Sequence, residues 1–227
     1  MVARVTATSI VDAIANDLRS RILEGELTSE SALTETDMAA SYDVARPTAK
    51  AAIEKLVSEG LLVRGAHKSA RVAELGPDSV RDIYLARAYL ESEVLRRLAL
   101  TRTVPHGAVQ ANLDIAAVAG DSPLAVVEPD MRFHTSLIDA VGNERISKMY
   151  RSLVSEVRLC MARVQSLNLL DTALIQAEHQ RLLELIAEGD GAARLLDEHL
   201  GRARERLAAA IGGEAGPEAH LLSTLHP

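Results

Sequence analysis

Residues 34–72 have the sequence TETDMAASYDVARPTAKAAIEKLVSEGLLVRGAHKSARV, and this stretch decides the fold of the N-terminal part of the chain. Thr34 and the acidic residues after it offer capping oxygens, which predicts the start of a short helix. After a turn, Arg46 and the following proline open a longer helix, since proline near the first helical position loses no hydrogen bond. Gly60 is a typical residue to end it. Two helices joined by a short turn indicate a helix-turn-helix.

Two further elements extend this motif on either side. Residues 10–23 carry Ile, Ile, Leu and Ile on one face at helical spacing, which predicts a first helix. The short apolar runs at 61–63 and 70–72 predict two strands of a hairpin. Three helices followed by a β-hairpin make a winged helix-turn-helix domain, which we expect to span residues 1–75.

The rest of the chain predicts helices alone. Their breaks carry Gly, Pro or Asn. The expected helices cover about 78–101, 104–119, 122–141, 143–167, 171–188 and 190–211. The fold class is therefore mainly α, with an all-α antiparallel helical bundle at 79–211. A linker is expected at 76–78 and a flexible tail at 212–227.

Composition narrows the class of protein further. The chain has 227 residues, of which 48% are hydrophobic and 2% aromatic, so a core of real size is expected and it must be aliphatic. A formal net charge of −7 excludes a bulk polycation, so any contact with nucleic acid must come from a local patch. The lone Cys160 cannot form a disulfide within the chain, which favours a reducing compartment.

Membrane association and secretion are not expected. No apolar run approaches the ~20 residues that a membrane-spanning helix needs, and the opening residues carry no signal-peptide pattern. We therefore expect a cytoplasmic protein with no membrane partner.

Basic residues gather in the region of the longer helix and the hairpin. Between Val44 and Val72 they are Arg46, Lys50, Lys55, Arg64, Lys68 and Arg71, against two glutamates. A recognition helix offers its N-terminal residues to base edges, here Arg46, Thr48 and Lys50. Lys68 and Arg71 lie in the hairpin, where they could reach phosphates or the minor groove. A solvated basic face is the alternative, but the order of the elements favours double-stranded DNA as a partner.

Four potential metal ligands fall on otherwise apolar helix faces. Asp130 and His134 are one turn apart, and His179 and His199 each lie on an aliphatic stripe with helical spacing. A buried polar group without a partner costs about 1–3 kcal/mol, so these four either have separate partners or share one. A shared divalent metal would satisfy all four; imidazole and carboxylate suit zinc first, and nickel, manganese or iron as alternatives. Otherwise each histidine is a core residue with its own partner.

The chain as a whole resembles one family of regulators from about residue 9 to residue 210. The N-terminal part is similar to the winged-helix domain of GntR-type bacterial transcription regulators. Its matching positions are Leu33, Glu35, Met38-Ala39, Val44, Arg46, Leu56, Glu59-Gly60-Leu61 and Val72. The second part resembles the all-helical FCD effector domain of the FadR-like subgroup. Its matching positions are the DMRFH segment at 130–134, Gly142-Asn143, Glu178-His179 and Glu198-His199-Leu200.

This resemblance implies a ligand-responsive regulator that is not an enzyme. It implies a homodimer on a two-fold symmetric operator, with repression relieved by ligand as the commoner behaviour of the family. It also implies that Asp130, His134, His179 and His199 hold a divalent metal whose open positions accept a small carboxylate effector. Arg87 lies on the inward face of its helix and resembles an arginine common in these domains, so it could clamp that carboxylate. An internal ion pair of Arg87 with Glu91 is the alternative.

Two departures from the family pattern matter. The recognition helix of the family usually begins Ser-Arg-Thr-Pro-Val-Arg-Glu, whereas residues 45–51 are ARPTAKA. Lys50 cannot make the forked contact to guanine that an arginine makes, so a divergent operator is expected. The interval from His179 to His199 is slightly shorter than is typical, and the shortening falls at 189–191, in a turn between helices.

Two other functional classes remain open at this point. In a metal sensor, the ion itself would be the signal. In a metal-dependent enzyme, histidines and a carboxylate would serve catalysis. The chain has no H-E-x-x-H motif, no Gly-rich phosphate loop and no Ser-His-Asp arrangement, and a winged domain before the bundle favours regulation.

Overall fold

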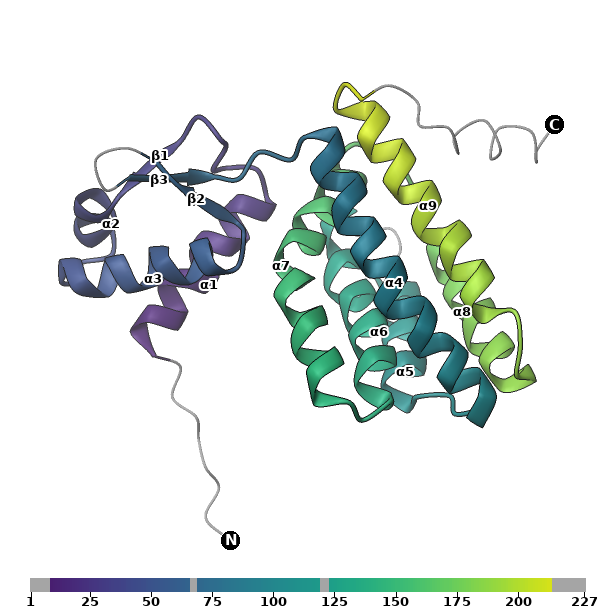
Figure 1. Ribbon diagram of the computed structural model, residues 1–227. Coiled ribbons are helices and arrows are strands. Elements are labelled where there is room, and N and C mark those ends of the chain that lie inside the picture. The colour runs from purple at the N-terminus through teal and green to yellow at the C-terminus, as the bar shows by residue number, and fades with distance from the viewer. Residues whose placement is uncertain (1–8, 66–68, 119–122, 214–227) are drawn as a thin grey trace, which may run out of the picture. The chain divides into compact units, whose positions relative to one another are not determined.

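A computed structural model describes residues 9–65, 69–118 and 123–213 of the chain. The chain divides into two compact units, residues 1–74 and 75–227 (Figure 1). The expected tail at 212–227 falls outside the described residues from position 214 onward.

The first unit contains the three helices that the sequence predicts. They are α1 (Ile10–Leu23), α2 (Glu35–Ser41) and α3 (Arg46–Ser58). The Thr34 side chain accepts a hydrogen bond from the backbone of Asp37 and so caps α2, as its sequence context indicates. Gly60 follows α3 with a φ of 75°, a left-handed conformation that glycine adopts without steric cost. The local sequence thus sets where these helices begin and end.

A three-stranded antiparallel sheet completes this unit, where the sequence predicts only a two-stranded hairpin. Strands β2 (Leu62–Arg64) and β3 (Ser69–Val72) are the expected pair. Strand β1 (Ala32–Thr34) adds to the other edge of β3, giving the order β1-β3-β2. Leu33 lies opposite Ala70 in this register, and both are buried. A strand of three residues has too little alternation to be detected from sequence, and it forms because β3 offers a free edge.

Small residues let α3 lie close against its neighbours in this unit. Ala49, Ala52, Ile53 and Leu56 form its buried face, and α3 contacts α1, α2 and β2. Arg19 of α1 binds Glu59 at the end of α3 through two nitrogens, at 2.7 and 3.1 Å. The N-terminal end of α3 is exposed to solvent. A recognition helix must be accessible at this end, because its first residues contact the bases.

The second unit is all-helical. Its elements are α4 (Pro77–Thr101), α5 (His106–Ala117), the 3₁₀ turn η1 (Pro123–Val126), α6 (Val127–Ala140), α7 (Glu144–Ser166), α8 (Thr172–Glu188) and α9 (Ala192–Ala210). The expected helix at 122–141 therefore opens with a 3₁₀ turn before it becomes α-helical. Asn143 caps α7 by accepting hydrogen bonds from the backbone N–H groups of Arg145 and Ile146.

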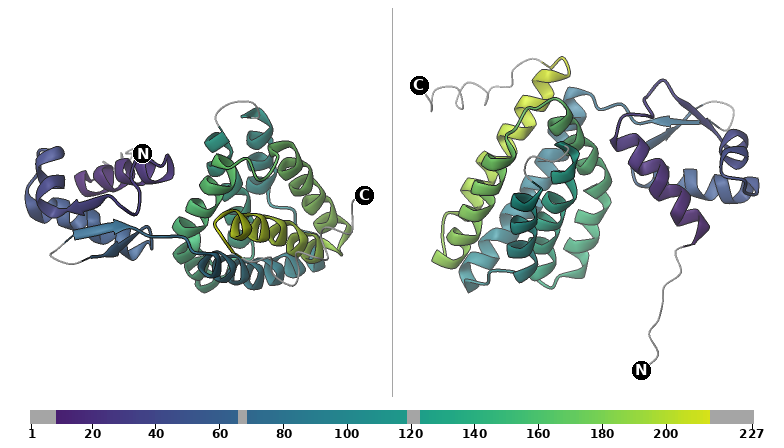
Figure 2. Two further views of the ribbon diagram at one scale, coloured as in Figure 1. Left: turned by 90° about the horizontal axis from the view of Figure 1, so that it is seen from above. Right: turned by 180° about the vertical axis from the view of Figure 1, so that it is seen from behind.

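The helices of the second unit enclose one hydrophobic core. Helix α4 lies along α9, and α5 lies along α6 and α8 (Figures 1 and 2). The core is almost wholly aliphatic, with Tyr84, Phe133 and Tyr150 as its buried aromatic residues, and it includes Cys160. Within the described residues, no helix combines the length and the apolarity that a bilayer crossing requires.

Candidate functional site

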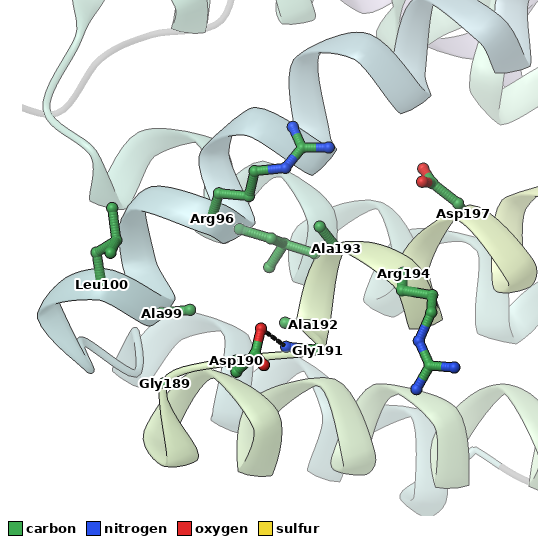
Figure 3. Close-up of a pocket in the computed structure, with 11 residues that line it drawn as sticks. Arg96, Ala99, Leu100, Gly189, Asp190, Gly191, Ala192, Ala193, Arg194 and Asp197 are labelled. Atoms are coloured by element: carbon green, nitrogen blue, oxygen red, sulfur yellow. Dashed lines mark hydrogen bonds between the residues drawn. The ribbon is translucent and has the colours of Figure 1, made fainter.

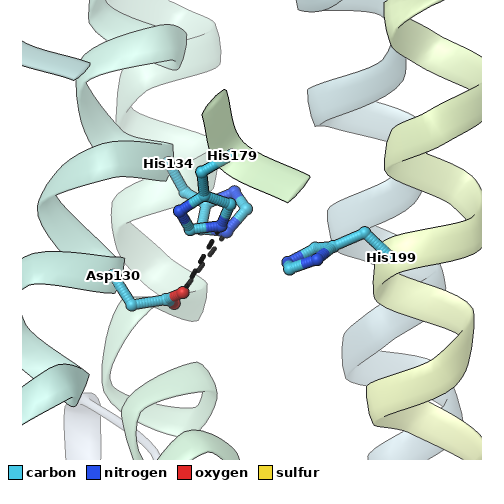
Figure 4. A group of neighbouring side chains, drawn as sticks. All are labelled: Asp130, His134, His179 and His199. Carbon is cyan, nitrogen blue, oxygen red and sulfur yellow. Dashed lines mark ion pairs between the residues drawn. The ribbon is translucent and has the colours of Figure 1, made fainter. Parts of the chain in front are cut away.

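The four predicted metal ligands meet inside the helical bundle. Asp130 and His134 project from α6, His179 from α8 and His199 from α9, and one ligand atom of each lies within 4.8 Å of all the others. Figure 4 shows His199 reaching toward the other three from the α9 side. Three helices that are far apart in sequence therefore supply one cluster, which is one of the two arrangements that the sequence leaves open.

The atoms of this cluster that face one another lack hydrogen-bond partners among the described residues. Both carboxylate oxygens of Asp130, Nε2 of His134 and both ring nitrogens of His179 are buried and unpaired. The separation from Asp130 is 3.9 Å to Nε2 of His134 and 3.6 Å to Nε2 of His179, too long for hydrogen bonds. Orphaned buried groups cost about 1–3 kcal/mol each, so their convergence fits a divalent ion as the missing common partner.

The protein environment favours the ionised form of Asp130 and the neutral form of His179. Asp130 lies in the first turn of α6, where the positive end of the helix dipole stabilises a carboxylate. Burial, and then the neighbouring His199 and His134, lower the pKa of His179 well below 6.5. A neutral imidazole with a free nitrogen is the form that binds a metal.

Two carboxylates that were not predicted as site residues support the outer sides of two histidines. Oε2 of Glu91, on α4, lies 2.6 Å from Nδ1 of His134. Oε2 of Glu178, on α8, lies 2.7 Å from Nδ1 of His199. Each histidine thus has a partner of its own on one nitrogen, while its other nitrogen remains on the cluster side. The alternative of a separate partner is therefore met on one nitrogen of each of these two rings.

Arg87 points into the same interior and is 1% exposed. Its Nε donates to Oε1 of Glu91 at 2.8 Å, so the internal ion pair that the sequence leaves open is present. Its Nη2 has no hydrogen-bond partner in the described part of the chain. Burial alone would raise the pKa of Glu91, but the charges of Arg87 and His134 and the hydrogen bonds from both outweigh it and lower this pKa. Glu91 is an anion, and Arg87 has one unused donor.

Among the basic residues of the first unit, those predicted to contact DNA are exposed wherever the structure describes them. Arg46, Lys50 and Arg71 are exposed and Thr48 is half-buried, while Lys68 lies outside the described residues. Ion pairs occupy the two other basic residues of this region. Lys55 binds Asp12 at 2.5 Å, and Arg64 binds Glu54 and Glu35. Arg46 and Lys50 stand near the N-terminus of α3, with no ion pair within the described residues.

A surface hollow of about 610 Å³ lies at the turn between α8 and α9 (Figure 3). Gly189 and Gly191 form this turn with φ values of 97° and 82°, and Asp190 accepts a hydrogen bond from the backbone of Gly191 at 2.7 Å. His179 and His199 come from the two helices that this turn joins, and both belong to the cluster. None of the four cluster residues lines the hollow.

Known families match both units. The FCD domain matches residues 82–202, and the family described as bacterial regulatory proteins of the gntR type matches residues 10–72. These ranges correspond to the helical bundle and to the winged helix-turn-helix, respectively.

Two curated relatives are also transcription regulators. The HTH-type transcriptional regulator BphR of Paraburkholderia xenovorans (strain LB400) is 33% identical over 92 residues, which is 40% of this chain and 38% of that protein. The Nta operon transcriptional regulator of Aminobacter aminovorans is 27% identical over 128 residues, which is 56% of this chain and 61% of that protein. The matched part is therefore less than two thirds of either relative.

Solved structures share the fold at low sequence identity. A transcriptional regulator GntR from Rhodococcus sp. RHA1 is 20% identical with a TM-score of 0.73, covering 88% of this chain and 98% of its own. McbR/YncC of E. coli is 16% identical with a TM-score of 0.69, covering 90% of this chain and 99% of its own. The chain therefore belongs to the GntR family of transcription regulators, with a winged helix-turn-helix domain followed by an FCD effector domain.

Proposed function

We propose that this regulator senses a small carboxylate at a metal-containing site in its helical bundle, and that the carboxylate changes its affinity for operator DNA. The observation that carries the proposal is the unpaired Nη2 of Arg87, a buried cationic donor whose partner Glu91 also contacts His134 of the metal-ligand cluster. Such a donor is costly unless an anion completes it. A carboxylate could bind the guanidinium through one oxygen and the metal through the other.

The metal would be held by Asp130, His134, His179 and His199. A set of three imidazoles and one carboxylate suits zinc first, with nickel, manganese and iron as alternatives. When bound, the ion would supply an electrophilic position for a ligand oxygen. The lowered pKa of His179 supports this role, because the imidazole remains neutral where a protonated ring would repel the ion.

DNA binding would use the exposed residues of the first unit. Arg46, Thr48 and Lys50 at the start of α3 would face base edges in the major groove, and Arg71 with Lys68 would reach the backbone from the hairpin. A homodimer would place two such helices on a two-fold symmetric operator. The protein would act in the cytoplasm as a repressor that ligand releases, because the ligand binds one arrangement of the dimer more tightly than the other.

A metal-sensing regulator is the second candidate. The existing ion pair between Arg87 and Glu91 favours it, because Arg87 already has one anionic partner without any ligand. In that case the ion alone would change DNA affinity. A metal-dependent enzyme is less well supported, since both matched families are regulatory.

Calorimetric titration of the zinc-loaded protein with a panel of small mono- and dicarboxylic acids tests the carboxylate proposal. Wild type should bind at least one acid, and Arg87→Met should weaken it at least tenfold while the protein still holds zinc. Arg145→Met removes an exposed arginine from α7 and is the matched control. Thermal unfolding checks that Arg87→Met folds.

Fluorescence anisotropy on DNA from the region upstream of this gene then separates the two candidates. If an acid that binds also shifts DNA affinity, and zinc alone doesn't, the carboxylate is the signal. If zinc alone shifts DNA affinity and Arg87→Met behaves as wild type, the ion is the signal and the role given to Arg87 is wrong.

A further inference from the structure

Two of the histidines in the metal-ligand cluster each contact a glutamate carboxylate through Nδ1, the ring nitrogen on the side away from the cluster. His134 contacts Glu91 and His199 contacts Glu178, in both cases through Nδ1 and at 2.6 and 2.7 Å. These short distances are typical of hydrogen bonds that involve a charged group. The two carboxylates come from α4 and α8, neither of which carries the histidine that it supports.

Each carboxylate is itself held by an arginine. Glu91 accepts from Nε of Arg87 at 2.8 Å, and the Tyr150 hydroxyl donates to the same oxygen at 2.9 Å. Glu178 is paired with Arg202 of α9 through its second oxygen. An arginine partner keeps the carboxylate ionised and limits its rotation, so the oxygen that faces the histidine stays an acceptor.

We propose that Glu91 and Glu178 are positioning residues that set the tautomer and the aim of His134 and His199 toward a metal ion. A carboxylate accepts a hydrogen bond from Nδ1–H, and the neutral ring then has its lone pair on Nε2. Nε2 of His134 is the nitrogen that faces Asp130. This inference rests on the proposed metal site and adds to it the residues that tune the affinity.

The Glu91–His134 pair and the Glu178–His199 pair differ in exposure to solvent, and this difference decides which glutamate is the better one to mutate. Glu91 and His134 are at most 1% exposed, whereas the side chains of Glu178 and His199 are 14% and 7% exposed. Removing Glu91 would leave the buried Arg87 without its anion, which threatens the fold. Glu178 lies nearer to solvent, and the Arg202 that it would leave behind is 21% exposed.

The experiment measures zinc affinity by competition with a chromophoric chelator, using the full-length chain. Glu178→Ala should weaken zinc binding roughly 10- to 100-fold, the usual range for loss of such a support. Glu178→Gln should lose less, because its amide oxygen can still accept from Nδ1–H. Glu184→Ala is the matched control: it removes another glutamate of α8, which is paired with Arg181 and Gln180 instead of a histidine.

A second readout is independent of zinc. Nitrogen chemical shifts of histidine rings in the metal-free protein should show His199 protonated on Nδ1 in wild type and a mixture of tautomers in Glu178→Ala. For the inner support, Arg87→Met combined with Glu91→Gln removes both charges of the buried pair. This double variant should weaken zinc binding by less than Glu178→Ala does, because the glutamine oxygen can still accept from Nδ1–H of His134.

The outcomes separate the two levels of the argument. A wild-type protein that binds no zinc overturns the proposed metal site itself. A wild type that binds zinc, with Glu178→Ala equally tight and the His199 tautomer unchanged, overturns only the positioning role. Weaker binding with a changed tautomer supports it.

Discussion

The imidazole ring of His179 lies flat against the ring of Phe133, with centroids 3.8 Å apart and 3° between the planes. Phe133 is the only phenylalanine of the chain. His179 has no hydrogen-bond partner in the described structure, so stacking takes the place that a carboxylate has for the other two histidines. One residue later on α6, His134 enters the same cluster.

Replacing Phe133 should therefore leave the His179 ring less firmly held in its orientation toward the cluster. We expect Phe133→Leu to weaken zinc binding several-fold and to cost about 1 kcal/mol or more of folding stability, because it removes buried contacts and the flat stacking surface. Chelator competition and urea unfolding measure the two effects. Leu137→Met, a volume-conserving change on the same helix, should leave zinc affinity as it is; an equal loss in both variants would point to general loosening of the core.

Zinc should stabilise the folded protein through the four ligands. At a free zinc concentration 100 times the Kd, stability should rise by about 2.7 kcal/mol, seen as a higher midpoint of thermal unfolding. His134→Ala should abolish most of this rise, since it removes one ligand of four. His106→Ala, an exposed histidine at the start of α5, should keep it. If zinc raised the unfolding midpoint of His134→Ala as much as that of wild type, the zinc ion would bind outside the cluster.

DNA affinity should depend on the exposed start of α3. Arg46→Ala should cost about 1–3 kcal/mol on a specific site and reduce discrimination against scrambled DNA, since it removes a base-edge contact. Arg71→Ala should lower the affinity for the specific site and for scrambled DNA by the same factor, and it should lower the salt dependence of binding. Anisotropy across a salt series measures both effects, with Arg145→Ala as the control. Arg46→Ala that binds as tightly and selectively as wild type would remove α3 from the interface.

The stability of the metal-free protein should fall as the solution becomes mildly acidic. Burial and the neighbouring histidines lower the pKa of His179 well below 6.5. As the pH falls through about 6.5, His179 therefore becomes protonated in the unfolded chain but stays neutral in the folded protein. The contribution of His179 is fully present above about pH 6.5 and is lost as the pH falls toward the folded pKa. Urea unfolding should show a loss of about 1 kcal/mol from this group between pH 7.5 and 5.5. His179→Gln should have a shallower pH dependence over the same range.

Cys160 should be chemically inert in the folded protein. Burial raises the pKa of its thiol to about 12, and the residue is fully enclosed in the bundle core. The thiolate is the reactive form, so iodoacetamide at pH 8 should label the native protein far more slowly than the protein in urea. Mass spectrometry follows the label, and rapid native labelling would mean that the bundle opens readily around α7.

Much of the fold follows from local sequence. The capping residues Thr34 and Asn143 and the helix-ending Gly60 act within one turn of themselves, so the boundaries of α2, α3 and α7 could be predicted to within a few residues. The third strand could not, because Ala32–Thr34 becomes a strand only by adding to β3, and that edge exists only after the hairpin has formed.

The sequence by itself also determined which residues would form the candidate site. An ionisable group on an apolar helical stripe must point inward, and this holds for Asp130, His134, His179 and His199 whichever way the helices pack. Tertiary structure alone decided that these stripes converge, that Glu91 and Glu178 stand behind two of the rings, and that Phe133 stacks on the third. The reason is physical: helical periodicity assigns a side chain to a face, whereas the neighbour across that face depends on how whole helices pack together.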